Sequence, residues 1–140
     1  MNRQTFPNAS TVESNQLISK KLLWTGRIVS GLAVLFFLVD GVMKLLKPAV
    51  VVEATRQLGY PESDIVAIGV VLLACTLLYV FRRTSILGAI LLTGYLGGAV
   101  ASQVRVGAGW FNVAFAAVFG VLVWAGLWLR DKRVRNLLSS

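Results

Sequence analysis

Four long apolar stretches, separated by charged or glycine-containing breaks, divide this chain. They cover residues 28–46, 65–81, 86–104 and 111–129. A helix needs about 20 apolar residues to cross the roughly 30 Å hydrocarbon core of a bilayer, and each stretch approaches that length. Because the last two breaks are short, neighbouring helices should run antiparallel. The pattern therefore predicts an all-α membrane protein, an antiparallel bundle of four transmembrane helices.

The composition also indicates a lipid environment. Hydrophobic residues make up 56% of the 140-residue chain and charged residues 14%, and the mean hydropathy is +0.74. A soluble domain of this size could not bury so much apolar surface. We therefore expect an integral membrane protein in contact with the lipid bilayer, of the bacterial inner-membrane type. The net charge of +8 indicates membrane orientation, and we expect no nucleic-acid partner.

The basic residues predict which way the helices cross. Cytoplasmic segments of membrane proteins carry an excess of Lys and Arg. Ten basic residues fall on the side of the two termini and four on the other side. Both termini should therefore be cytoplasmic, and the first and third spans should run outward. The four outer residues are Lys44, Lys47, Arg56 and Arg105.

The ends of the chain differ from the middle. Residues 1–20 are polar and rich in Ser, Thr and Asn, a composition typical of a disordered tail. Residues 21–130 form the transmembrane domain, and residues 131–140 form a basic C-terminal tail.

The outer link between the first and second spans has a helical pattern of its own. Pro48 suits a first helical turn, and Gly59 suits a helix end. We expect a short amphipathic helix that either lies on the outer membrane surface or covers a cavity between the spans. Its apolar positions and Thr55 recur at helical spacing: Val51, Ala54, Thr55 and Leu58.

Asp40 and Lys44 are charged residues inside the first apolar stretch. Ionised side chains in lipid are costly and need a partner or a function. A spacing of four residues puts these two on one helix face. Either Lys44 neutralises Asp40 and anchors the helix end by reaching the headgroups, or the deeper Asp40 belongs to a binding site.

The third span carries a stripe of small residues. Small residues at such spacing permit close contact between helices, and the contact could serve the fold or a homodimer. The predicted packing residues are Gly94, Gly98, Ala101 and Ser102.

Arg105 continues this stripe at the outer end of the third span, and Gln103 lies beside it. Both should therefore share an outer layer with Asp40 and Lys44. In that layer one carboxylate faces two cations, so positive charge is in excess. If Arg105 pairs with Asp40, then Lys44 and the Gln103 amide are left to bind a ligand carbonyl or a small anion. These four residues are the predicted ligand site.

Few redox cofactors suit this chain. Histidine is absent and Cys75 is the single cysteine. This excludes haem ligation by His, zinc sites of the His/Cys type and a CxxC dithiol centre, and we expect no metal site and no covalent cofactor. Any redox catalysis would therefore need a partner subunit.

Three segments resemble the DoxX-like family of small four-span membrane proteins. They are FLVDGVMKLLKP in the first span, LGYP in the outer link and GAILLTGYLGGAVASQVRVG through the third span. The similarity runs from about residue 28 to 129. By the resemblance, Lys44 and Arg105 match recurrent basic residues of the family, with Asp40 and Gln103 as companions. Family members often carry His where Gln103 stands, so a mechanism that uses an imidazole does not carry over.

The resemblance implies a role in redox chemistry. The family takes its name from a subunit of a thiosulfate:quinone oxidoreductase, and relatives are described as membrane partners in redox or oxidative-stress complexes. It implies a subunit without cofactors in a quinone-linked or stress-related redox complex, with a redox partner subunit and an outer pocket for a quinone. Two alternatives stay open: a small multidrug-type transporter, and a membrane scaffold or assembly protein without catalysis.

Overall fold

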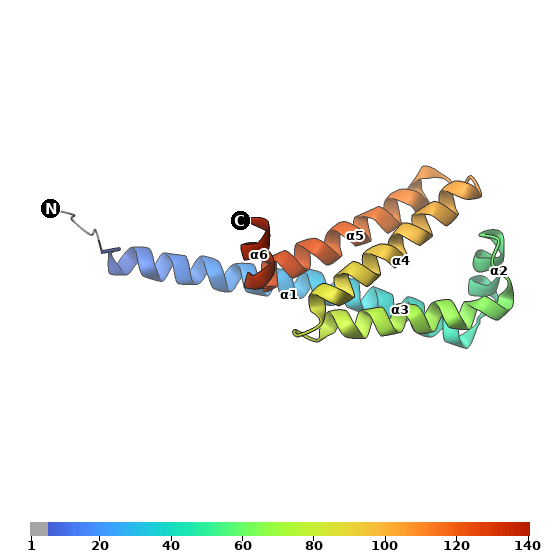
Figure 1. Ribbon diagram of the computed structural model, residues 1–140, viewed down its shortest axis with the longest axis horizontal. Helices are drawn as coiled ribbons and strands as arrows, with labels where there is room; N and C mark the ends of the chain where they lie inside the picture. Colours follow the sequence, from blue (N-terminus) through green and yellow to red (C-terminus); the bar gives the residue numbers. More distant parts are fainter. Residues whose placement is uncertain (1–5) are drawn as a thin grey trace.

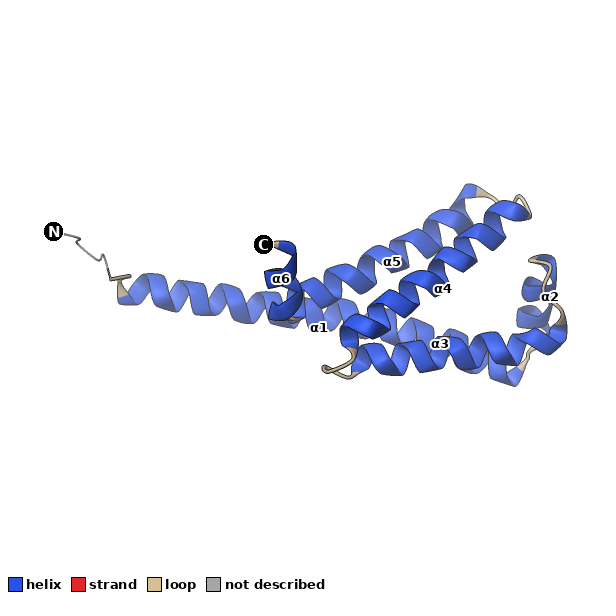
Figure 2. Cartoon of the chain, in the orientation of Figure 1, coloured by secondary structure: helices blue, strands red, loops and turns tan. Residues whose placement is uncertain are grey.

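The computed structural model describes residues 6–140, and within them it is helical with short connections (Figures 1 and 2). The long helices are α1 (Ala9–Leu46), α3 (Ile65–Val80), α4 (Ser85–Arg105) and α5 (Trp110–Arg130). Across the described part of the chain, four helical segments are long and apolar enough to cross a membrane. The predicted all-α architecture with four apolar helices is confirmed.

The four helices form a ring. Helix α1 packs against α3 and α5, and α4 packs against the same two helices. The fully buried side chains at the centre include Phe37, Leu72, Tyr79, Leu92 and Val123. Figure 1 shows the helices close together near α6 and diverging toward α2. We call these two ends of the bundle the α6 end and the α2 end.

The outer link contains α2 (Ala49–Gln57) and the short 3-10 helix η1 (Glu62–Asp64). Pro48 precedes the first turn of α2, which suits a residue without a backbone N–H. Gly59 has a φ of +86°, a conformation that side chains disfavour, and it ends the helix. The predicted short helix after the first span is confirmed.

Helix α1 is longer than expected. It begins at Ala9, so the expectation of a disordered tail over residues 1–20 is wrong for residues 9–20, while residues 1–5 lie outside the described part. The first span already forms a helix, so extending it toward the N-terminus needs no new nucleation. Each residue that joins the helix gains a backbone hydrogen bond. Its 38 residues correspond to about 57 Å, well beyond a bilayer core. Figure 1 shows this first part projecting past α6.

Glycines and Tyr79 hold the α6 end together. A Cβ on Gly88 would lie 2.5 Å from the Cα of Tyr79, and one on Gly126 would lie 3.0 Å from the backbone N of Ser30. The Tyr79 hydroxyl donates to the Val123 carbonyl at 2.8 Å, and the Arg130 guanidinium donates to the Tyr79 carbonyl at 2.7 Å. The helices therefore meet here at backbone distance.

The basic C-terminal tail contains a short helix, α6 (Lys132–Leu138). Asp131 caps it by accepting a hydrogen bond from the backbone N–H of Arg133 at 2.9 Å. Burial of Asp131 raises the pKa of its carboxyl, but the hydrogen bonds and charge of Arg133 outweigh this and bring the pKa below its usual value. Arg133 also donates to the Arg82 carbonyl, which ties α6 to the α3–α4 connection.

Candidate functional site

A cavity of about 700 Å³ lies at the α2 end, where the four helices diverge. All four long helices and the outer link contribute to its walls. Because Val51, Ala54, Thr55 and Leu58 line it, the outer link covers a cavity, which was one of its two predicted roles. Thr55 is buried, and its hydroxyl donates to the Val51 carbonyl at 2.8 Å.

One wall of the cavity is aromatic. Phe36 and Phe37 come from α1, and Phe115 and Phe119 come from α5. The rings of Phe36 and Phe119 stack with centroids 4.1 Å apart, and Phe36 meets the edge of Phe115 at 5.5 Å. The sequence did not predict this wall, because the position of a Phe in an apolar stretch does not show which way its ring faces.

Asp40 and Lys44 form an ion pair at the cavity. The Lys44 ammonium donates to an Asp40 carboxylate oxygen at 2.5 Å, as their spacing predicts. The Lys44 side chain is 15% exposed and that of Asp40 is 33% exposed. Lys44 is therefore the more buried member of the pair. Its side chain turns toward Asp40. A Cβ on Gly69 of α3 would lie only 2.8 Å from the Lys44 Cβ, so the two helices approach closely at this point.

Arg105 does not join this pair. Its guanidinium donates to the Leu58 carbonyl at 2.7 Å and lies against Gly59, and it is not part of the cavity lining. The predicted bridge between Asp40 and Arg105 is wrong. Carbonyls at a helix C-terminus lack intrahelical partners, and Arg105 satisfies the one that α2 leaves at Leu58. Arg105 thus holds the link against α4.

The charge of the cavity differs from the prediction as well. Asp64, at the end of η1, lines the cavity, whereas Arg105 does not. The charged lining residues are then Asp40, Asp64 and Lys44, two carboxylates and one ammonium. The expected excess of positive charge is therefore wrong, because the link supplies an acid and withdraws Arg105.

The small residues of α4 also have a different role from the predicted one. Gly94, Gly98 and Ser102 line the cavity, whereas Ala101 is exposed outside it. A Cβ on Gly94 or Gly98 would meet no atom of the described chain within 4 Å. Close packing by this stripe inside the fold is therefore wrong. The α6-end glycines make the close contacts, and a homodimer through α4 stays a prediction.

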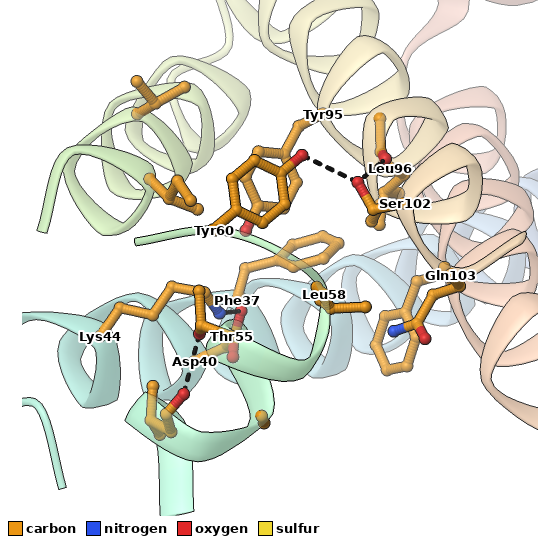
Figure 3. Close-up of a pocket in the computed structure, with 18 of the residues that line it drawn as sticks. Phe37, Asp40, Lys44, Thr55, Leu58, Tyr60, Tyr95, Leu96, Ser102 and Gln103 are labelled. Carbon is orange, nitrogen blue, oxygen red and sulfur yellow. Dashed lines mark hydrogen bonds and ion pairs between the residues drawn. The ribbon is translucent and has the colours of Figure 1, made fainter. Parts of the chain in front are cut away.

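Three further polar residues of the cavity lining were missed: Tyr60, Tyr95 and Asn112. The Tyr60 hydroxyl reaches from the link to the Ser102 hydroxyl of α4, at 2.8 Å (Figure 3). Tyr95 lies two helical turns before Ser102, on the same face, a spacing that could have found it. Asn112 is a polar residue near the start of the last apolar stretch, which was also a signal.

The polar groups of the lining fall into two sets. Asp40, Lys44, Tyr60 and Ser102 have partners within the chain. Within residues 6–140, the Tyr95 hydroxyl and the side-chain amides of Gln103 and Asn112 make no hydrogen bond. All three residues are accessible enough to contact a ligand. Gln103, predicted from the sequence, therefore lines the cavity with its amide unoccupied (Figure 3).

Comparison with known families matches residues 28–126, more than half of the chain, to the profile of the DoxX-like family. The chain belongs to the DoxX-like family. The matched region contains every residue of the DoxX-like cavity, from Phe36 to Phe119, whereas the first part of α1 and all of α6 lie outside it. Comparisons with curated proteins and with solved structures gave no match.

Proposed function

We propose that this DoxX-like protein is a subunit without cofactors of a quinone-linked membrane redox complex, and that its cavity binds the quinone headgroup. The observation that carries the proposal is the pairing of an aromatic wall with unoccupied hydrogen-bond donors around one cavity. Cavities of about 300–1,000 Å³ suit small ligands, and this one holds about 700 Å³.

A quinone matches this lining in shape and polarity. Its planar ring can stack on Phe36, Phe119 or Phe115, which prefer offset or edge contacts with a second ring. Its carbonyl oxygens only accept hydrogen bonds, and amide and phenol groups donate them. Gln103, Asn112 and Tyr95 therefore supply the donors that two carbonyls require.

The ion pair adds a fixed positive end near the ligand. Asp40 holds the Lys44 ammonium in one position by a charge-assisted hydrogen bond. An ammonium fixed in this way needs no rearrangement when negative charge develops on a quinone oxygen. Since the chain contains no histidine and a single cysteine, the electrons would come from the cofactors of a partner subunit.

Titration of ubiquinone-1 into the protein in lipid nanodiscs, followed by calorimetry against empty nanodiscs, tests the proposal. The double variant Gln103→Leu/Asn112→Leu should bind about tenfold more weakly or worse, because two hydrogen bonds are lost. Gln57→Leu is the matched control, since this exposed amide of α2 lies outside the cavity lining and donates a hydrogen bond to Glu53. Absence of binding by the unaltered protein, or equal binding by the double variant, would contradict it.

A small multidrug-type transporter is the second candidate, and the charge of the lining favours it. Asp40 and Asp64 outnumber Lys44, so a cationic substrate meets a negative cavity. In proteoliposomes, ethidium transport that Asp64→Asn abolishes would support this candidate. Quinone binding without any ethidium transport would support the redox subunit instead.

A further inference from the structure

Side-chain contacts border the cavity on three sides. Toward α1 and α5, the stacked rings of Phe36 and Phe119 close it. At the outer end, the contact of Tyr60 with Ser102 joins the link to α4 across it. Toward the α6 end, Phe37 and Leu96 belong both to the lining and to the buried core, and so form its floor.

The fourth side, between α3 and α4, is formed mostly by small residues. Ala67 and Val71 line it from α3, and Gly94 and Gly98 line it from α4. A Cβ on either glycine would meet no atom of residues 6–140 within 4 Å, and Val71 is 52% exposed. Figure 1 shows α3 and α4 running apart from their shared connection toward the α2 end. The positions of Gly94 and Gly98 therefore border open space on this side of the cavity.

This side lies within the apolar length of both spans. An opening at that depth leads into hydrocarbon and not into water. A ligand that uses it must be soluble in lipid, and a chain attached to its headgroup can remain in the opening. The polar groups Tyr95, Gln103 and Asn112 then contact the headgroup inside.

We propose that the cavity opens sideways into the membrane between α3 and α4, and that its ligand carries a long hydrocarbon tail that leaves over Gly94 and Gly98. For the headgroup, this inference rests on the proposed function. Gly94 and Gly98 leave room for the tail because they have no side chains. A tail gains no hydrophobic free energy by moving from lipid into an apolar opening, so the glycines admit the tail without attracting it.

Gly97 provides a matched control. It is next to Gly98, and a Cβ on it also meets no atom of the described residues within 4 Å, but it lies outside the cavity lining. Gly98→Leu places a side chain in the opening, whereas Gly97→Leu does not. Ala67→Phe narrows the same opening from α3 and serves as a second variant if Gly98→Leu does not fold.

Photolabelling tests the opening without any quinone. The full-length protein is placed in nanodiscs that contain a phosphatidylcholine with a diazirine on its acyl chain, and labelled residues are found by mass spectrometry after illumination. We expect labelling of Tyr95 inside the cavity, its loss in Gly98→Leu and Ala67→Phe, and its retention in Gly97→Leu. No labelling of Tyr95 in the unaltered protein, or equal labelling in all variants, would overturn the inference.

Two quinones connect the opening to the ligand. Gly98→Leu should weaken binding of decylubiquinone about tenfold more than it weakens binding of the tail-less ubiquinone-0, whereas Gly97→Leu should leave both unchanged. If neither quinone binds while Tyr95 is labelled, the quinone proposal fails and the opening stands. If both quinones bind equally to the unaltered protein and to Gly98→Leu, the opening fails and the quinone proposal stands.

Discussion

The hydroxyl of Tyr60 lies 2.8 Å from the hydroxyl of Ser102, although the two residues are 42 positions apart in the chain. This contact joins the outer link to α4 at the outer end of the cavity (Figure 3). Ser102 also donates to the Gly98 carbonyl at 2.9 Å, so both hydroxyls take part in one short network. The outer link is thus fastened to α4, which follows it in the chain only after α3.

Tyr60→Phe should loosen the outer link. Loss of this hydrogen bond should reduce the free energy of unfolding by about 1 kcal/mol, and Ser102 keeps a partner in Gly98. Hydrogen–deuterium exchange of residues 49–62 should become faster. In the Tyr60→Phe background, Ser102→Ala should reduce the free energy of unfolding little further. A second loss as large as that of Ser102→Ala alone would show that the two hydroxyls act independently.

Lys44→Met should destabilise the bundle, because it leaves the partly buried Asp40 carboxylate without its partner. We expect a loss of about 1–3 kcal/mol. The double variant Asp40→Asn/Lys44→Met should recover part of this lost stability. Denaturant titration in detergent measures the free energy of unfolding of the single and double variants, with Lys47→Met as the control outside the cavity. Losses that simply add in the double variant would show that the pair does not stabilise the fold.

Gly88→Ala should destabilise the protein far more than Gly94→Ala. At Gly88 the added Cβ would collide with the Tyr79 backbone at 2.5 Å, and overpacking of this kind costs about 1–3 kcal/mol or more. At Gly94 the space is empty, and Ala favours helix by up to about 1 kcal/mol. Thermal unfolding of the two variants side by side should give shifts of opposite sign. A stable Gly88→Ala protein would contradict the close packing at the α6 end.

The cap of α6 should make stability depend on pH in the acidic range. The folded pKa of the Asp131 carboxyl lies below its usual value, so its contribution to stability is present above about pH 4 and is lost as pH falls through the folded pKa. Thermal unfolding from about pH 6 to about pH 3 should show this loss, and Asp131→Asn should reduce it. An unchanged acid dependence in Asp131→Asn would assign the effect to other carboxyls.

Both termini should lie in the cytoplasm. The termini carry most of the basic residues, and such segments remain on the inner side. A C-terminal green fluorescent protein fusion should fluoresce, and a C-terminal alkaline phosphatase fusion should be inactive. A fusion after Gly107, in the α4–α5 connection, should give the opposite result with both reporters. Active phosphatase at the C-terminus would reverse the assigned orientation.

Much of the fold follows from local sequence. Four apolar stretches, their breaks and the helix after Pro48 could be predicted because each depends on near neighbours in the chain. The pairing of Asp40 with Lys44 is of the same kind, since one helix sets their separation. The early start of α1 at Ala9 was missed, because a helix that continues from a span needs little further signal in the sequence.

The site followed the sequence less closely. Gln103 was predicted at the cavity and is there, but Arg105, only two residues further, turns to the Leu58 carbonyl. Gly94 and Gly98 were expected to contact another helix and instead line empty space. Whether a small residue packs or opens a gap depends on the distance to the neighbouring helix, and the stripe itself does not contain that distance.

The sequence by itself determined the number of spans, the family and the ion pair of the first helix. These depend on composition and on separations within one helix, which the backbone geometry fixes. Only the tertiary structure decided that the helices diverge, that Tyr60 crosses to Ser102, and that Asp64 replaces Arg105 at the cavity. Such contacts join residues far apart in the chain, and their distances arise from how the helices cross.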